Sequence, residues 1–307
     1  MLSRFSAAVP VANACVEPAC GEIDDVRLKQ ALAEATARLT ANTVPSPRMN
    51  AELLLMFTLG CDRAHLYAHP ERDLTADEAS LYQAALSERV HGVPAQYITG
   101  HQEFWGMDLI VSPAVLIPRP ETEHLIETVL ELAAARSSTL KIRIIDVGTG
   151  SGCIALALAK ELRQGEILAT DVSTAALEIA RANAARHQFD GRIHFREADL
   201  LGGFEDNLFD FVVSNPPYVG DSEEDEVQLE VRKFEPRNAV FAGPTGLEII
   251  ARLIPQARAA LKPGGWLVME ISGAIVEGVK QLLNGWEEIR IVKDLQRIPR
   301  VIAARTS

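Results

Sequence analysis

The chain has 307 residues, of which 48% are hydrophobic and 23% are charged, a composition that excludes intrinsic disorder and leaves room for about two globular domains. Its 30 Lys and Arg are outnumbered by 42 Asp and Glu, so the formal net charge is -12, which argues against non-specific nucleic-acid binding. No apolar run approaches the roughly 18 residues of a membrane span.

Cysteine usage indicates a reducing compartment, so we expect a cytoplasmic protein. No CxxC pair occurs, and no histidine stands at zinc-finger spacing, so the sequence predicts neither a metal site nor a disulfide framework. The cysteines are Cys15, Cys20, Cys61 and Cys153.

Residues 1–22 are expected to form a disordered N-terminal extension. The segment is poor in acids and its Ala-Asn-Ala stretch at 12–14 resembles a signal-peptidase site, which leaves export or organelle targeting as the alternative. Arg4 is its one basic residue and Pro10 interrupts its short apolar run, so we favour the untargeted extension.

Residues 23–92 are predicted to form a small helical domain, because apolar residues recur three and four positions apart with interruptions at Pro47 and Pro70. Its helices are expected to include residues 51–59 and 76–90. Residues 93–117 are predicted to be a connector, since apolar and polar residues alternate around Gly100 and Gly106, as in a β-hairpin.

Residues 118–307 alternate short aliphatic runs with helical stretches, which is typical of parallel βαβ units that bind ligands at the carboxyl ends of their strands. A helix is expected over 122–135. The predicted strands are 142–147, 167–171, 193–196, 209–214 and 266–271.

A glycine-rich loop follows the first of these strands and precedes an apolar helix. Glycine permits a tight turn and close approach of the backbone to a ligand, and the helix N-terminus offers free N–H groups. The spacing is GxGxG, without the GxGxxG of dinucleotide folds or the Lys of a P-loop. The loop consists of Gly148, Thr149, Gly150, Ser151 and Gly152.

Acidic residues follow the next two strands, and together with the loop they favour S-adenosyl-L-methionine as the cofactor, with S-adenosyl-L-homocysteine as the product. Asp171 stands about 20 residues after the loop, where it would accept hydrogen bonds from both ribose hydroxyls. Asp199 and Leu200 would hold the edge and the face of the adenine. The alternative is a simple strand-to-helix turn in which Asp171 caps a helix.

The motif Asn215-Pro216-Pro217-Tyr218 follows the fourth predicted strand. The two prolines fix the backbone, so the Asn215 carboxamide oxygen and the Pro216 carbonyl can form a rigid pair of acceptors for a planar NH2 group. Tyr218 would pack against the planar substrate, and positioning would supply most of the catalysis. A strand-ending turn without chemistry is the alternative.

Methyltransferases of class I that modify adenine N6 or glutamine N5 share such a motif, and the sequence resembles them. Adenine has to be flipped out or presented by a basic channel, which this acidic chain does not offer. Adenine-N6 methylation is therefore the less favoured alternative.

The chain resembles the release factor glutamine methyltransferases, the PrmC/HemK family, over nearly its whole length after about residue 24. The run Pro118 to Glu123 separates this family from the similar ribosomal protein L3 glutamine methyltransferases, which remain the alternative. The other runs that carry the resemblance are Ala51 to Leu55, Pro94 to Gly100, Glu103 to Gly106, Leu116-Ile117, Phe234 to Arg237 and Gly246-Leu247.

The resemblance implies an α/β fold of the class I methyltransferase type, Rossmann-like with a seven-stranded mixed sheet, joined by a β-hairpin to the N-terminal helical domain. It implies that Asn215, Pro216, Pro217 and Tyr218 receive the glutamine of the Gly-Gly-Gln loop of class I peptide-chain release factors. The helical domain would dock the release factor. We expect a monomer with no membrane partner and no direct nucleic-acid partner.

Three side chains of the run Pro118 to Glu123 would shape the methionine end of the cofactor site or the substrate mouth, unless they only cap the following helix. They are Arg119, Glu121 and Glu123.

Phe104 is expected to form an apolar wall near the transferred methyl, with packing between hairpin and catalytic domain as the alternative. The chain departs from the family after Glu270, where Ser272 replaces a common glycine. This departure leaves a non-catalytic module as a third hypothesis.

Overall fold

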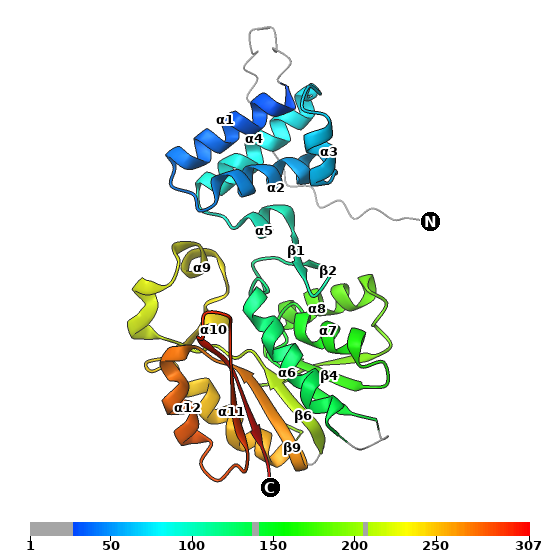
Figure 1. The fold of residues 1–307 in the computed structure, drawn as a ribbon, viewed down its shortest axis with the longest axis vertical. Coiled ribbons are helices and arrows are strands. Elements are labelled where there is room, and N and C mark those ends of the chain that lie inside the picture. Colours follow the sequence, from blue (N-terminus) through cyan, green and yellow to red (C-terminus); the bar gives the residue numbers. More distant parts are fainter. Residues whose placement is uncertain (1–26, 137–140, 205–207) are drawn as a thin grey trace.

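The computed structural model describes residues 27–136, 141–204 and 208–307. Figure 1 shows a helical domain at one end of the molecule and an α/β domain at the other, with a short helix and a hairpin between them. The extension predicted for residues 1–22 lies outside the described residues.

The helical domain packs its apolar faces around Leu39, Leu54, Leu55 and Tyr82, all fully buried. Its second helix starts at Pro47, four residues before the predicted start, because proline suits the first helical turn, where its missing N–H costs nothing. The helices are α1 (Leu28–Ala41), α2 (Pro47–Leu59), α3 (Arg63–Ala68) and α4 (Ala76–Val90).

The connector holds one helical turn, α5 (Ala95–Thr99), before the hairpin of β1 (His101–Phe104) and β2 (Met107–Ile110). The hairpin is confirmed, but the helical turn α5 was not part of the connector predicted over residues 93–117. Trp105 and Gly106 both have positive φ, as a two-residue hairpin turn requires.

The α/β domain is built on the seven-stranded mixed sheet that the resemblance implied, in the order β10-β11-β9-β6-β3-β4-β5. Only β11 runs antiparallel to its neighbours β9 and β10. The strands are β3 (Arg143–Val147), β4 (Glu166–Asp171), β5 (Ile193–Glu197), β6 (Phe209–Ser214), β9 (Leu261–Glu270), β10 (Ile289–Lys293) and β11 (Pro299–Arg305).

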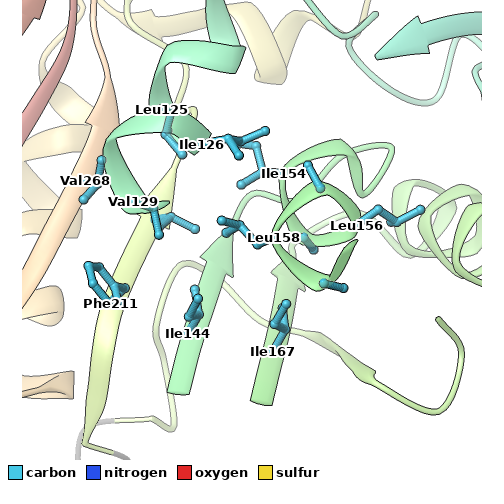
Figure 2. Close-up of a cluster of buried hydrophobic side chains, with 14 of the residues drawn as sticks. Leu125, Ile126, Val129, Ile144, Ile154, Leu156, Leu158, Ile167, Phe211 and Val268 are labelled. Carbon is cyan, nitrogen blue, oxygen red and sulfur yellow. The ribbon is translucent and has the colours of Figure 1, made fainter. Parts of the chain in front are cut away.

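Both faces of the sheet are covered by helices. Figure 2 shows apolar side chains of α6 (Glu123–Ala134) and α7 (Cys153–Glu161) over Ile144, Phe211 and Val268 of the strands. The opposite face packs against α11 (Glu248–Ala260) and α12 (Val276–Leu282). Burial on both faces explains why the central strands are continuous apolar runs.

The register of the parallel strands creates the site. Val147 pairs with Thr170 and with Ser214, and Ser214 pairs with Met269. The residues that follow these four positions therefore emerge at the same edge of the sheet. They are Gly148, Asp171, Asn215 and Glu270.

The remaining elements surround this edge or connect to it. Between β6 and α11 the chain forms β7 (Val219–Gly220), η2 (Asp221–Glu226), α9 (Leu229–Phe234), α10 (Arg237–Val240) and β8 (Phe241–Gly243). The others are η1 (Pro120–Thr122), α8 (Thr174–Arg186) and η3 (Gly273–Ile275).

An ion pair between a buried arginine and a partly buried glutamate joins the two domains. Arg89 of α4, almost fully buried, donates from Nη2 to Oε1 of Glu230 in α9 at 2.8 Å. It also donates from Nε to Asn50 Oδ1 and from Nη1 to the carbonyl of Val93. Since every donor branch has a partner, the guanidinium fixes α9 against the helical domain.

Candidate active site

Two cavities meet at the carboxyl edge of the sheet. The first, of about 400 Å³, is lined by the glycine-rich loop and by the ends of β4 and β5, and the second, of about 420 Å³, lies beyond Asn215. Both cavities share Leu116, Arg119, Asn215, Pro217 and Ala239 in their linings. A ligand in one cavity can therefore reach a ligand in the other only past these residues.

The glycine-rich loop adopts the tight turn that its sequence predicts, with positive φ at Gly148, Gly150 and Gly152. Gly152 lies at the start of α7, where a Cβ would come within 2.7 Å of Leu156 Cδ1, so no side chain fits there. The structure brings the first four loop residues into the lining of the first cavity and places Gly152 behind it.

The fully buried carboxyl group of Asp146 supports the glycine-rich loop. Thr149 Oγ1 donates to Asp146 Oδ2 at 2.7 Å, while burial raises the pKa of Asp146 to about 7. The side chain of Asp146 does not line the first cavity. It therefore holds the loop and is not exposed to a ligand.

Asp171 lines the first cavity. Its Oδ2 accepts a hydrogen bond from Gly150 N, and its Oδ1 accepts one from Ser173 N, both at 2.9 Å. Burial raises the pKa of Asp171 against these bonds. Each carboxylate oxygen keeps acceptor capacity for a ligand hydroxyl.

Asp199 and Leu200 also line the first cavity. Asp199 is exposed and forms an ion pair with Arg252 of α11 at 2.5 Å. Leu200 has positive φ, and its carbonyl accepts from Thr170 Oγ1 at 3.3 Å. Arg252 lines the cavity but is absent from the predicted set, because α11 lies about 50 residues further along the chain.

The motif Asn215 to Tyr218 forms one wall of the second cavity. Asn215 Nδ2 donates to Thr122 Oγ1 at 3.3 Å, and Thr122 Oγ1 donates to Glu270 Oε2 at 2.6 Å. Tyr218 Oη donates to the other oxygen of Glu270 at 3.1 Å. Three segments far apart in sequence are thus joined at the motif, with Thr122 in the lining of the first cavity and Glu270 in that of the second.

Burial raises the pKa of Glu270, while the hydrogen bonds from Thr122 and Tyr218 and the charge of Arg300 oppose that rise. Burial also raises the pKa of Tyr218, so its phenol stays protonated and acts as a donor. Neither Thr122 nor Glu270 belongs to the predicted set of site residues. The sequence did hold one signal that could have identified Glu270 as a site residue, namely its charge at the end of the apolar strand β9.

The run from Pro118 to Glu123 separates into side chains that face the cavities and one that does not. Arg119 lines both cavities and pairs with buried Glu235, which also accepts from Ile117 N. Glu121 lines the second cavity. Glu123 instead accepts from Trp105 N and holds the hairpin, as a structural role would require.

Gly246 packs directly against the back of the motif. Its φ is +78°, and a Cβ there would lie 2.5 Å from the carbonyl oxygen of Tyr218. Only glycine fits both the backbone conformation and the space.

Comparison with known proteins identifies the family. Residues 30–100 match the model of the PrmC N-terminal domain, and residues 122–233 match the methyltransferase small domain. A release factor glutamine methyltransferase of Koribacter versatilis is 55% identical over 279 residues, covering 91% of this chain and 98% of the relative. The chain belongs to the release factor glutamine methyltransferases. A relative of the same name from Xylella fastidiosa is 41% identical over 88% of this chain and 97% of its own.

Solved structures show the fold of this glutamine methyltransferase family member. The hMettl16 catalytic domain, in complex with MAT2A 3'UTR hairpin 6, matches with a TM-score of 0.53 at 21% identity, covering 72% of this chain and 81% of that one. At this identity the likeness supports the class I methyltransferase fold and nothing about substrate.

Phe104 requires a correction. It lies 2% exposed in the core shared by the hairpin, α6 and α7, together with Met107 and Leu109, and it lines neither of the two cavities. In the two-residue hairpin its side chain turns inward, toward the α/β domain. Its position supports packing of the hairpin and not a wall beside the transferred group.

Within the part of the chain that the structure describes, no group of three or more His, Cys, Asp or Glu side chains is arranged to hold a metal ion. In the same part, no helix combines the length and the apolar character that crossing a membrane requires.

Proposed function

We propose that this glutamine methyltransferase transfers a methyl group from S-adenosyl-L-methionine to the side-chain amide nitrogen, N5, of the glutamine in the Gly-Gly-Gln loop of class I release factors. The observation that carries the proposal is the position of Asn215 between the two cavities, with its NH2 group bound to Thr122 and its oxygen left for a substrate NH2. The names of the curated relatives support the same substrate.

The first cavity has the donor set that this cofactor needs. Asp171 offers two carboxylate oxygens for the ribose hydroxyls, and the buried Ser151 Oγ lines the cavity with no hydrogen-bond partner among the described residues. We assign cofactor binding to Gly148, Thr149, Gly150, Ser151, Gly152, Asp171, Asp199, Leu200 and Asn215, with Gly152 acting by shaping the turn. When bound, the cofactor supplies an electrophilic methyl group on its sulfonium.

The second cavity would orient the glutamine amide. Asn215 Oδ1 and the Pro216 carbonyl would each accept one N–H of the substrate, which fixes the plane of the amide and directs its nitrogen toward the first cavity. The ring of Tyr218 and the rigid Pro217 would pack on the two sides of that plane. Positive charge develops on the nitrogen during transfer, so oriented acceptors lower the barrier. The resulting cation loses its proton to water.

The helical domain is proposed to dock the release factor outside its loop. Met49, Phe57, Tyr67 and Leu81 expose large apolar surface on this domain, and surfaces of that kind often mark protein contacts. We further propose that the enzyme acts as a monomer in the cytoplasm, which size-exclusion chromatography with light scattering and localisation of the native protein would check.

Mass spectrometry of a full-length class I release factor tests the proposed function. Incubation with enzyme and cofactor is expected to add one methyl group to the wild-type factor and none to a variant whose loop glutamine is alanine. Absence of methylation despite bound cofactor would contradict the proposal. Ribosomal protein L3 would then be tried as the next glutamine substrate, and nucleic acid after it.

A further inference from the structure

A buried carboxylate in the lining of the second cavity contacts Tyr218 of the motif and Thr122, which lines the first cavity. Glu270, 3% exposed, ends β9 beside β6 and accepts hydrogen bonds from Thr122 Oγ1 and Tyr218 Oη, one at each oxygen. Thr122 comes from η1, more than 90 residues before Asn215 and 148 before Glu270. The contacts Tyr218–Glu270, Glu270–Thr122 and Thr122–Asn215 form one continuous chain that ends at the carboxamide of Asn215.

The direction of this chain follows from the chemistry of its members. A threonine hydroxyl has one hydrogen to donate, and each oxygen of Glu270 accepts a hydrogen bond, one from Thr122 and one from Tyr218. Because Thr122 donates that hydrogen to Glu270, it can only accept from Asn215. The group of Asn215 that faces Thr122 must then be the NH2, and the carboxamide oxygen must face the cavities.

We propose that Thr122 and Glu270 are positioning residues that set the polarity of the Asn215 carboxamide, so that its oxygen and not its NH2 group meets the substrate. The inference rests on the proposed function, because a substrate NH2 needs an acceptor. With the carboxamide inverted, two NH2 groups would face each other and the transition state would lose a hydrogen bond. Glu270 also fixes the ring of Tyr218, because it accepts a hydrogen bond from Tyr218 Oη.

Glu270→Gln is the sharpest test. It keeps the shape of the side chain and its ability to form hydrogen bonds, but one of its two acceptor oxygens becomes a donor NH2 group. A glutamine NH2 can donate to Thr122, which frees the threonine hydrogen to donate to the Asn215 oxygen and stabilises the inverted carboxamide. Thr122→Val removes the acceptor at constant volume, and Thr122→Ser keeps it. Thr128→Val is the matched control, since Thr128 is a buried threonine of α6 that bonds only the His124 carbonyl and lines neither cavity.

Steady-state kinetics on a release factor give the main readout. We expect Glu270→Gln and Thr122→Val to lower kcat at least about 10-fold, since an oriented transition-state hydrogen bond is lost. The KM for the release factor and the Kd for S-adenosylhomocysteine should stay within about two-fold, and Thr122→Ser should regain most of kcat. Wild-type kcat in both variants, or a loss matched by weaker S-adenosylhomocysteine binding, would overturn the inference.

Nitrogen-15 NMR of the side-chain amides provides a readout that does not depend on activity. The Asn215 signal, identified by its absence in Asn215→Ala, should move in Thr122→Val and Glu270→Gln and stay in place in Thr128→Val. An inactive wild type with these shifts would reject the proposed substrate but support the positioning chain. An unmoved Asn215 signal would reject the positioning chain, whatever the substrate.

Discussion

The two cavities that meet at Asn215 are built in different ways. In the first, the turns after neighbouring strands hold each other: the Asp171 carboxylate accepts from the backbone N–H of Ser173, two residues away, and from that of Gly150 in the loop after the adjacent strand. The second is assembled by side-chain contacts between segments far apart in the chain, as between Thr122 and Glu270. The difference suggests that cofactor affinity depends on local geometry, whereas substrate orientation depends on the tertiary fold.

The largest effect on activity is expected from Asn215→Ala. Loss of the oriented acceptor should lower kcat by roughly 100-fold or more, while S-adenosylhomocysteine affinity, which depends on many contacts of the first cavity, should stay close to wild type. Methylation kinetics and calorimetric titration would measure the two quantities. Equal losses in both would show that the cavities do not act separately.

Asp171→Ala is expected to have the opposite pattern. Removing a charged, two-pronged acceptor should weaken cofactor binding by roughly 10- to 100-fold and change kcat at saturating cofactor much less. Asp199→Ala is the comparison variant. Its loss of cofactor affinity should be smaller, because Asp199 is exposed and already paired with Arg252. Calorimetry showing wild-type affinity for Asp171→Ala would contradict the ribose role.

A smaller effect, confined to the second cavity, is expected from Glu230→Gln. This change removes the charge that Arg89 holds between the domains, and α9 continues directly from Val227 and Gln228, which line the second cavity. The KM for the release factor should rise about three-fold or more, with unchanged S-adenosylhomocysteine affinity. The exposed neighbour Glu226 provides the control variant Glu226→Gln. A rise in cofactor Kd instead would mean that α9 supports the first cavity.

The smallest effect on activity is expected from Asp146→Asn, which should alter stability with pH. The folded state holds the Asp146 proton up to a pKa of about 7, well above the usual value of an aspartate. The free energy of unfolding contributed by this group therefore falls as pH rises from about 4 to 7 and levels off above. The variant lacks this pH dependence of stability. The melting temperature of the variant minus that of the wild type should therefore increase from pH 5 to pH 8. Parallel pH profiles would refute the assignment.

The sequence predicted the residues of the first cavity well, because each of them belongs to a short stretch of sequence that can be recognised by itself. The loop 148–152 and Asp171 follow apolar strands at a recognisable spacing, and parallel strands bring their ends to one edge. The central strands were placed within one residue, except that β9 starts at Leu261 instead of 266. Leu261 pairs with Phe209 and Trp266 with Phe211, and the turn-like residues Pro263, Gly264 and Gly265 lie in the register shift between these two pairs.

The second cavity could be predicted only in part. Asn215 to Tyr218 stand out as a motif, but Thr122 was visible only as the start of a helix and Glu270 only as the end of a strand, because their contact spans 148 residues. Phe104 was misplaced for the same reason, since the packing of a hairpin is decided by helices that follow it. The edge strand β10 and its neighbour β11 were not predicted from residue pattern. For β10 the reason is that the strand is largely exposed and its alternation is weak.

The close approach of Gly246 to the carbonyl of Tyr218 has a consequence for anyone who screens variants of this enzyme. Residue 246 lines neither cavity, so a map of pocket residues would mark it as free to vary. A single added carbon there would nevertheless press on the backbone of the motif and displace Tyr218, which lines the second cavity. In a mutational scan, position 246 should therefore resemble an active-site position, with inactive variants that still accumulate as folded protein.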